Sequence, residues 1–497
     1  MTIDLIIVGV YIGGMVALGL LLARRSSHTE AFMAADRALP GWAVGMSIFG
    51  TYVSSISYLA NPGKAYASNW NPFVFSLSLP LAAWIATRYF VPFYRRTGTV
   101  SAYTHLERRF GTWARLYAVA CYLLTQIGRV ATILYLVSLA VSPLLMGADI
   151  ALIIVVLGLL VTLYTLTGGI EAVIWTDVVQ SVVLTLGMLV TIGVLYSAMP
   201  ISAGEFWQVA VRDQKFSLGD TGLSLLRPGP GMTSTFWCVL LYGMTINLQN
   251  FGIDQSYVQR YATASSDGAA RRSVWLGALL YIPTSAVLFL IGTGLYVYYH
   301  VQPVADLPAK PDQVFPFFIQ TELPIGVRGV LIAAILAAAM SSVDSSLNSS
   351  ATLVLCDVVR RFHKTPLSER QEMAVLYGAT LGWGIVGTLA GLAMTRVHTA
   401  LDVWWTLAGI FGGGMLGLFL LGRLSDRIGS RAAATGVVCG VGVILWSSLV
   451  HPGSVLWPVI KSWPLVPLLV NPLDPLLTIV LGTATIVAVG WSVGGRS

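Results

Sequence analysis

Long apolar segments recur along the chain, separated by short polar connections. Thirteen of them approach the roughly 20 residues that a helix needs to cross the hydrocarbon core of a bilayer. They cover about 3–23, 40–60, 71–93, 115–143, 150–167, 171–198, 233–258, 273–299, 328–356, 373–394, 402–421, 432–450 and 475–493. The pattern predicts an all-α integral membrane protein with about 13 transmembrane helices.

The 40–60 segment is unusually polar for a membrane span. Its small and hydroxylic residues are Gly50, Thr51, Ser54, Ser55 and Ser57, and Asn61-Pro62-Gly63 follows. Such a segment predicts a helix that unwinds within the membrane and exposes backbone carbonyls to a cavity. The alternative is close helix packing through small residues.

The 233–258 segment has the same character, five spans later. Its polar residues and glycine are Asn247, Gln249, Asn250, Gly252, Asp254 and Gln255. Interrupted helices at corresponding positions of two halves are typical of an inverted repeat, with the substrate between them near the midplane. We therefore expect a five-plus-five repeat over 40–198 and 233–421, with a leading helix at 3–23 and trailing helices in 432–493.

Oxygen-bearing residues crowd the 328–356 segment. Ala338, Ser341, Ser342 and Ser345 share one face at spacings of three and four, and Asp344 and Asn348 lie beside them. Oxygen ligands suit hard cations such as Na⁺. Serine hydroxyls can instead bond to their own helix, which explains one or two serines but not the whole face.

Two charged residues fall inside other apolar segments. Asp177 lies one to two turns into 171–198, and Arg129 lies in the middle of 115–143. Each costs a few kcal/mol in the membrane unless it faces the interior and meets a partner. Arg129 is a candidate for binding an anionic substrate, and the alternative is a structural ion pair with Asp177 or Asp254.

The composition agrees with a membrane protein. Of the 497 residues, 56% are hydrophobic and 10% are charged, whereas soluble domains carry about 25% charged residues. The mean hydropathy is +0.76. These values exclude a soluble enzyme, a disordered chain and a fibrous protein. The sequence also lacks GxSxG, HExxH and GxxxxGK[ST] motifs, so we predict neither an enzyme nor an ATP-driven pump.

The net charge of +7 reflects topology, because the cations lie in the connections between spans. With an outer N-terminus, the connections predicted to be cytoplasmic hold 19 Lys and Arg residues, Arg260 among them, and the outer ones hold 8. Cytoplasmic connections of membrane proteins carry the excess of positive charge. We expect a multi-pass protein of the plasma (inner) membrane with a cytoplasmic C-terminus, in contact with lipid and without nucleic acid or an obligatory protein partner. The outer segments 200–231 and 301–327 are expected to form short surface helices or a partial lid.

Several motifs resemble the sodium:solute symporter family. They are Gly168-Gly169, Trp175-Thr176-Asp177, Gln180, the run from Asp254-Gln255 to Val258-Gln259-Arg260, and the serine-rich 328–356 segment. The resemblance extends over about residues 1–450. It implies a LeuT-like inverted repeat with one extra helix before and two after.

The resemblance also implies sites for one or two co-transported Na⁺ ions. The first would use the carbonyls of Gly50, Val53 and Ala338 and the hydroxyls of Ser341 and Ser342. The second would use Asp177, Ser341, Asp344 and Ser345. Asp344 adds a carboxylate where several relatives have Ser or Thr.

Two shorter matches, Ser54-Ser55-Ile56 and Gln126 to Arg129, resemble the bacterial sialic acid symporters within this family. The resemblance implies that Arg129 meets a substrate carboxylate, assisted by Ser54 and Ser57. Tyr52 stands where those carriers have a small hydroxyl residue, which alters the pocket. We therefore expect sodium-driven import of a small organic anion, such as sialic acid. The alternatives are a neutral sugar or other small solute, or proton coupling through Asp177 or Asp344.

Overall fold

The computed structural model describes residues 2–145, 147–229, 232–396, 400–424, 426–452, 454, 457–463 and 466–494. Within these ranges the chain is helical, and its strand-like pairings are two isolated bridges, Leu39 with Ala264 and Leu226 with Leu473. The long helices are α1 (Thr2–Ala23), α9 (Thr112–Val141), α10 (Ile150–Ser197), α14 (Asp267–Val301), α16 (Val327–Leu353), α18 (Glu369–Met394), α19 (Ala400–Leu424), α20 (Ser430–Leu449) and α23 (Thr478–Gly494).

Three of the expected spans are interrupted helices. The 40–60 segment forms α3 (Gly41–Tyr52) and α4 (Ser55–Ala67), and 233–258 forms α12 (Phe236–Ile253) and α13 (Gln255–Thr263). The 71–93 segment is built from α5 (Val74–Leu77), α6 (Leu79–Ile85), a π-helical turn (Ala86–Phe90) and α7 (Val91–Thr97). Short helices complete the connections: α2 (Thr29–Ala34), α8 (Thr104–Phe110), α11 (Ala203–Arg212), α15 (Pro311–Thr321) and α17 (Arg360–Phe362).

Every range expected to span the membrane is helical. In the described ranges, nine helices are long and apolar enough to cross a membrane, or ten when the α3–α4 pair, bent by 54°, counts as one span. The other three expected spans fall on two shorter apolar helices, Ile150–Leu166 and Gly409–Leu424, and on the interrupted pair α12–α13. The expected number of thirteen thus depends on shorter and broken helices.

A break at Gly169 divides α10 where two spans are expected to meet. Gly169 has φ +56°, a conformation that glycine adopts at little cost. A Cβ atom there would lie 2.8 Å from the carbonyl oxygen of Phe32. The position therefore requires glycine both for its dihedral angle and for the close approach of α2.

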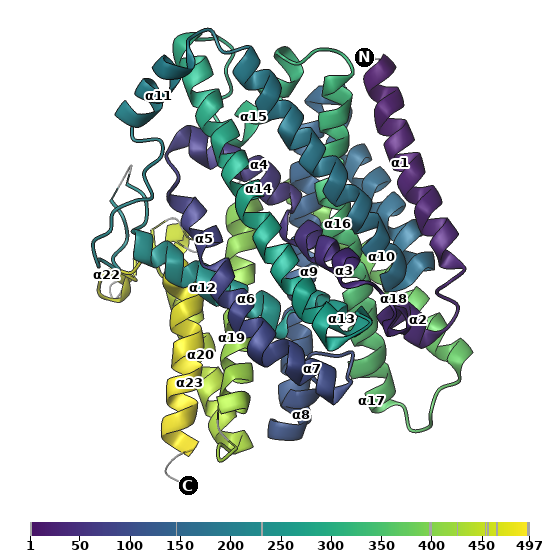
Figure 1. Ribbon diagram of the computed structural model, residues 1–497. Coiled ribbons are helices and arrows are strands. Elements are labelled where there is room, and N and C mark those ends of the chain that lie inside the picture. The colour runs from purple at the N-terminus through teal and green to yellow at the C-terminus, as the bar shows by residue number, and fades with distance from the viewer. Residues whose placement is uncertain are drawn as a thin grey trace.

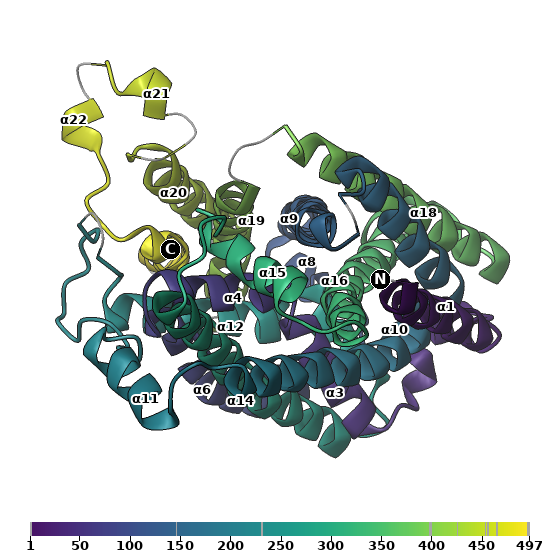
Figure 2. The same cartoon turned by 90° about the horizontal axis from the view of Figure 1, so that it is seen from above.

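The helix α16 forms the centre of the molecule (Figures 1 and 2) and contacts α1, α3, α9, α10 and α18. In its most apolar stretch, 94% of the residues are buried. By contrast, α10 exposes Leu152, Leu159 and Leu189, as expected for a helix that faces lipid. The helices α19, α20 and α23 pack together at one side. The start of α1 and the end of α23 lie at opposite ends of the molecule (Figure 1).

The two segments expected to lie outside contain the expected short helices, α11 in 200–231 and α15 in 301–327. Figure 2 shows α15 near the middle of the upper face, where it contacts α4 and α16. Lys215, which follows α11, fixes the end of α4, because its Nζ donates to the carbonyls of Tyr66 at 2.7 Å and Ser68 at 2.9 Å. Both connections are therefore packed onto the bundle.

Candidate ion and substrate sites

The backbone unwinds between α3 and α4, as the sequence predicts. Val53 has non-helical dihedral angles, φ −84° and ψ 81°. The amide of Ser54 donates to the Tyr52 carbonyl at 3.1 Å, which takes it away from the helical bond to Gly50. A break in a membrane helix leaves carbonyl oxygens available for ions or substrate. The Gly50 carbonyl lies at this position.

The N-terminus of α4 closes the other side of the break. Ser54 is the N-cap, and its Oγ accepts from the Ser57 amide at 3.4 Å. The Ser57 hydroxyl donates to the Ser54 carbonyl at 2.9 Å. Both side chains are half-buried. Two hydroxyls and the positive end of a helix dipole together favour an anionic group.

Arg129 reaches the same break from α9. Its Nη2 donates to the Thr51 carbonyl at 3.2 Å, and the side chain is half-buried. Among the described residues no ion pair within 4.0 Å joins Arg129 to Asp177 or Asp254, and Asp177 pairs with Arg260 instead. These contacts favour a role for Arg129 at the break over a direct structural ion pair. The Thr51 carbonyl that it contacts lies three residues before Ser54, and the guanidinium has further donors for a ligand.

Tyr52, the last residue of α3, points to α12. Its hydroxyl donates to Asn247 Oδ1 at 3.2 Å. Its ring packs against Phe251, Tyr257 and Tyr281, with centroid distances of 5.5, 5.1 and 5.4 Å. Tyr52 thus joins the two interrupted helix pairs through an aromatic cluster, and a smaller residue would leave this space unfilled.

The residues expected at the first sodium site lie where α3 approaches α16. A Cβ atom at Gly50 would lie 3.2 Å from Ser341 Oγ, so the two helices touch at that point. Ala338, Ser341 and Ser342 are fully buried. Ser342 Oγ lies 3.4 Å from the Ala338 carbonyl. Ser341 Oγ makes no hydrogen bond with any described residue, which leaves it available as a ligand.

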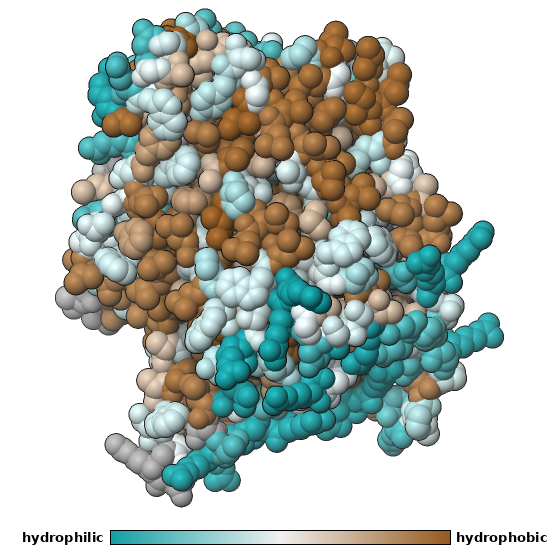
Figure 3. Space-filling model, viewed as in Figure 1, coloured by the Kyte–Doolittle hydropathy of each residue, from teal (hydrophilic) through white to brown (hydrophobic). Residues whose placement is uncertain are grey.

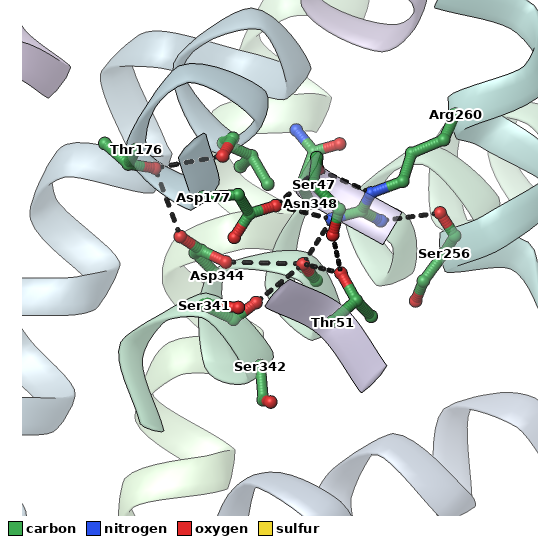
Figure 4. A network of polar contacts seen from close by, with 12 residues as sticks. Ser47, Thr51, Thr176, Asp177, Ser256, Arg260, Ser341, Ser342, Asp344 and Asn348 are labelled. Carbon is green, nitrogen blue, oxygen red and sulfur yellow. Dashed lines mark hydrogen bonds and ion pairs between the residues drawn. The ribbon is translucent and has the colours of Figure 1, made fainter. Parts of the chain in front are cut away.

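The residues expected at the second site share one buried network with Arg260 (Figure 4). Asp177 Oδ2 accepts from Ser47 Oγ at 2.5 Å and from Arg260 Nη2 at 2.9 Å. The same Nη2 lies 2.6 Å from Ser345 Oγ. Ser345 Oγ in turn donates to the Ser341 carbonyl at 2.7 Å. The structure therefore brings α3, α10, α13 and α16 together around Asp177.

Asp344 is the second carboxylate of the network. Its Oδ2 accepts from the Tyr164 hydroxyl at 2.8 Å and from Thr176 Oγ1 at 3.4 Å. Its Oδ1 lies 3.4 Å from Ser345 Oγ. These contacts are all hydroxyls, and the ion pair of Arg260 goes to Asp177. With both carboxylates ionised, the three charged groups leave one negative charge in the protein interior.

The position of Arg260 differs from the one that the sequence predicts. The residue was assigned to a cytoplasmic connection, but its side chain is 0% exposed. The reason is that α13, which follows the break at Asp254, packs against α2, α3, α7 and α16, so all of its residues are buried. The motif around Val258-Gln259-Arg260 was the available signal. Ser47 and Tyr164 were also missed, because one serine or tyrosine in an apolar segment is unremarkable.

A model of the sodium:solute symporter family matches residues 32–440. The chain belongs to this family. The sodium/sialic acid symporter SiaT of Proteus mirabilis is 36% identical over 88% of this chain and 87% of its own length. The sodium/sialic acid symporter NanT of Aliivibrio fischeri is 32% identical over 90% and 87%. The protein is thus a sodium-coupled symporter and not an enzyme, as predicted.

Solved structures agree with this assignment. A Na⁺-coupled sialic acid symporter in a substrate-bound, outward-open state superposes with a TM-score of 0.87 at 30% identity, covering 100% of this chain and 98% of the other. The nucleobase-cation-symport-1 transporter Mhp1 in a closed conformation shares the fold, with a TM-score of 0.59 at 14% identity over 94% of each chain. The expected LeuT-like, multi-span architecture is confirmed.

Proposed function

We propose that the protein imports a sialic acid, or a similar carboxylated sugar, by alternating access driven by Na⁺. The proposal rests on the position of Arg129, whose guanidinium donates to the Thr51 carbonyl beside the break between α3 and α4. The names of the two bacterial relatives point to the same substrate class.

In this proposal Arg129 binds the substrate carboxylate, since guanidinium and carboxylate form charge-assisted hydrogen bonds. Ser54 and Ser57 lie at the N-terminus of α4 and supply hydroxyls to the same ligand. Tyr52 bounds the pocket on the side of α12 through its bond to Asn247. The larger tyrosine makes the pocket smaller than a hydroxyl residue would.

The first Na⁺ would bridge α3 and α16. Its ligands would be the carbonyl oxygens of Gly50, Val53 and Ala338. The hydroxyls of Ser341 and Ser342 would complete the set. Such a bridge would order the unwound segment that the substrate needs, so sodium and substrate would each raise the affinity for the other. The freed carbonyl at Gly50 and the unbonded Ser341 Oγ support this assignment.

A second Na⁺ would bind among Asp177, Ser341, Asp344 and Ser345. Support comes from the negative charge that the network carries when both carboxylates are ionised. It also comes from Asp177 Oδ1, which is buried without a hydrogen bond among the described residues. The guanidinium of Arg260 already neutralises Asp177. The ion would therefore lie closer to Asp344.

The two halves of the transporter would be 40–198 and 233–421, with 3–23 before them and 432–493 after them. We infer an outer N-terminus and a cytoplasmic C-terminus in the plasma (inner) membrane. In favour of this orientation, hydrophilic residues gather over the lower part of the face shown in Figure 3, beneath a hydrophobic region.

Proteoliposomes with radiolabelled N-acetylneuraminic acid test the proposal. We expect accumulation above equilibrium with an inward Na⁺ gradient, and none with K⁺ or with an inward proton gradient alone. Arg129→Gln should abolish the accumulation while Na⁺ still raises the thermal unfolding temperature.

Uptake driven by a proton gradient in sodium-free buffer would contradict sodium coupling. Uptake of neutral sugars, with no competition by sialic acid, would contradict the substrate. Sodium-dependent thermal stabilisation of the same preparation shows that the protein is folded in either case.

A further inference from the structure

Five arginines converge on one cavity at the arginine-rich end of the bundle. The cavity has a volume of about 580 Å³. Its arginines come from separate segments of the chain: Arg88, Arg96, Arg108, Arg271 and Arg423. They lie on the π-helical turn, α7, α8, α14 and α19. Residues this far apart in the sequence meet here only through the tertiary fold.

These five arginines differ from their neighbours in charge pairing. At the same end, Arg95 pairs with Asp267 at 2.8 Å and Arg360 with Glu372 at 2.6 Å. In the described part of the chain, by contrast, none of the five forms an ion pair; Arg423 lies 5.1 Å from the centroid of Phe93. Like charges gathered without counter-charges repel one another. The cavity therefore favours an anion.

The side chain of His105 reports the same positive field. His105 lies on α8, packed against Phe93 with ring centroids 4.9 Å apart. Burial lowers the pKa of its imidazole, and the positive charges of Arg423, Arg109 and Arg108 lower it further. The local field thus disfavours an added cation and stabilises an added anion.

The cavity opens where the protein surface changes from apolar to polar. Tyr89 and Pro92 line it together with the arginines. Tyr89 is 50% exposed, and Trp84 and Leu81, one and two helical turns earlier, are 52% and 54% exposed. The rings of Trp84 and Tyr89 are in contact. Exposed Trp and Tyr beside apolar residues are typical of the membrane–water interface, which places the cavity at the level of lipid headgroups.

A π-helical turn positions Arg88 and Tyr89 in the wall of the cavity. The turn covers Ala86–Phe90 within an otherwise α-helical segment. Single π-helical turns shift the following side chains around the helix and are frequent at functional sites. Arginine binds phosphate oxygens in a planar, bidentate manner.

We propose that this arginine pocket binds the phosphate headgroup of an anionic phospholipid from the surrounding bilayer. A diphosphate lipid such as cardiolipin matches five positive charges better than a single phosphodiester does. The site is separate from the transport sites, since it shares no residue with them.

Lipid binding to the delipidated full-length protein tests this. Cardiolipin, phosphatidylglycerol and phosphatidylcholine are titrated in neutral detergent and followed by native mass spectrometry. The test variant is Arg88→Gln/Arg271→Gln. The matched control is Arg272→Gln/Arg370→Gln, which removes the same charge from exposed positions outside the cavity.

We expect cardiolipin to bind most tightly and phosphatidylcholine most weakly. Each basic residue contributes about 1 kcal/mol near an anionic headgroup, so the test variant should bind cardiolipin about 30-fold more weakly. The control variant should keep the wild-type affinity. Both variants should retain sodium-driven uptake in liposomes of neutral lipid, which shows that they are folded.

Equal loss in the test and control variants would overturn the proposal, because net charge alone would then explain binding. Displacement of cardiolipin by inorganic phosphate or glycerol phosphate at millimolar concentration would assign the cavity to a soluble phosphate. Displacement by sialic acid would assign it to the transported anion. Either displacement would overturn the lipid assignment.

Discussion

Two carboxylates and one guanidinium share the buried network between α10, α13 and α16. The guanidinium of Arg260 bonds to Asp177 and to Ser345, whereas the Asp344 carboxylate rests on hydroxyl donors. A buried negative charge with only neutral donors is costly. A cation that enters the network is therefore stabilised most near Asp344. We expect some of the surrounding residues to bind the ion and others to hold the helices together.

A substitution at Ser341 tests ion binding separately from the stability of the helices. The Oγ of Ser341 is buried and makes no hydrogen bond within the described chain, so Ser341→Ala should remove a proposed sodium ligand without leaving a protein group unsatisfied. We expect the Na⁺ concentration for half-maximal uptake to rise about 2- to 12-fold, since one such interaction contributes about 0.5–1.5 kcal/mol. Ser346→Ala is the control, because Ser346 Oγ bonds to its own helix at the Ser342 carbonyl. Equal sodium curves for both variants would count against the first site.

Arg129→Gln tests the anion site at the same scale. A charged hydrogen bond contributes about 1.5–3 kcal/mol, so sialic acid affinity should fall about 10- to 150-fold. Calorimetric titration in saturating Na⁺ measures this directly. Glutamine keeps a polar amide at this position but removes the positive charge. An unchanged affinity would show that the carboxylate binds elsewhere.

At the scale of the elements, the ion pair between Arg260 and Asp177 joins α13 to α10. Both side chains are 0% exposed. Breaking a buried pair by removing one partner costs about 3–5 kcal/mol, because the other charge stays buried. We expect Arg260→Gln and Asp177→Asn each to lower the thermal unfolding midpoint strongly. The double variant should unfold at a midpoint well above the one that the sum of the two single losses predicts.

The Arg95–Asp267 pair provides the comparison for this double-mutant cycle. Asp267 is 58% exposed, and exposed pairs contribute about 0–1 kcal/mol. The coupling between Arg95→Gln and Asp267→Asn should therefore be small, and Asp267→Asn alone should shift the midpoint little. Arg95→Gln also removes the bond from Nη1 to the Ala264 carbonyl at 2.8 Å. Additive losses for Arg260 and Asp177 as well would mean that the two helices are held together by other contacts.

The sequence predicts these elements unevenly, for physical reasons. The breaks at Ser54 and Asp254 were visible because lipid disfavours clustered polar residues, and Gly168-Gly169 divided α10 at the expected place. Arg260 was misplaced because a cation after an apolar segment has the pattern of a connecting loop. Its burial depends on the packing of α13 and on its contact with Asp177, 83 residues away in the sequence. Composition and periodicity carry no record of such a contact.

For the whole molecule, the number of coupled sodium ions sets the power of transport. A tenfold Na⁺ gradient supplies about 1.4 kcal/mol per ion, and a membrane potential of about 100 mV supplies roughly 2.3 kcal/mol per net charge. One Na⁺ with a monoanion is electroneutral and gives about tenfold accumulation. Two Na⁺ ions supply about 5 kcal/mol, nearly four orders of magnitude of accumulation.

The charge of the buried network favours coupling to two Na⁺ ions. Because Arg260 neutralises one of two carboxylates, one Na⁺ near Asp344 would make the network neutral, and transport of two Na⁺ with one anion would carry a net positive charge inward. We expect sialic acid to evoke an inward current in voltage-clamped proteoliposomes. Asp344→Asn should remove that current while leaving slower, electroneutral uptake through the first site. Tyr164→Phe, which removes a hydroxyl donor to Asp344 but keeps the carboxylate, should keep the current. A wild-type current that follows the proton gradient instead of the Na⁺ gradient would show that Asp344 carries a proton, and uptake without current would leave a single sodium site.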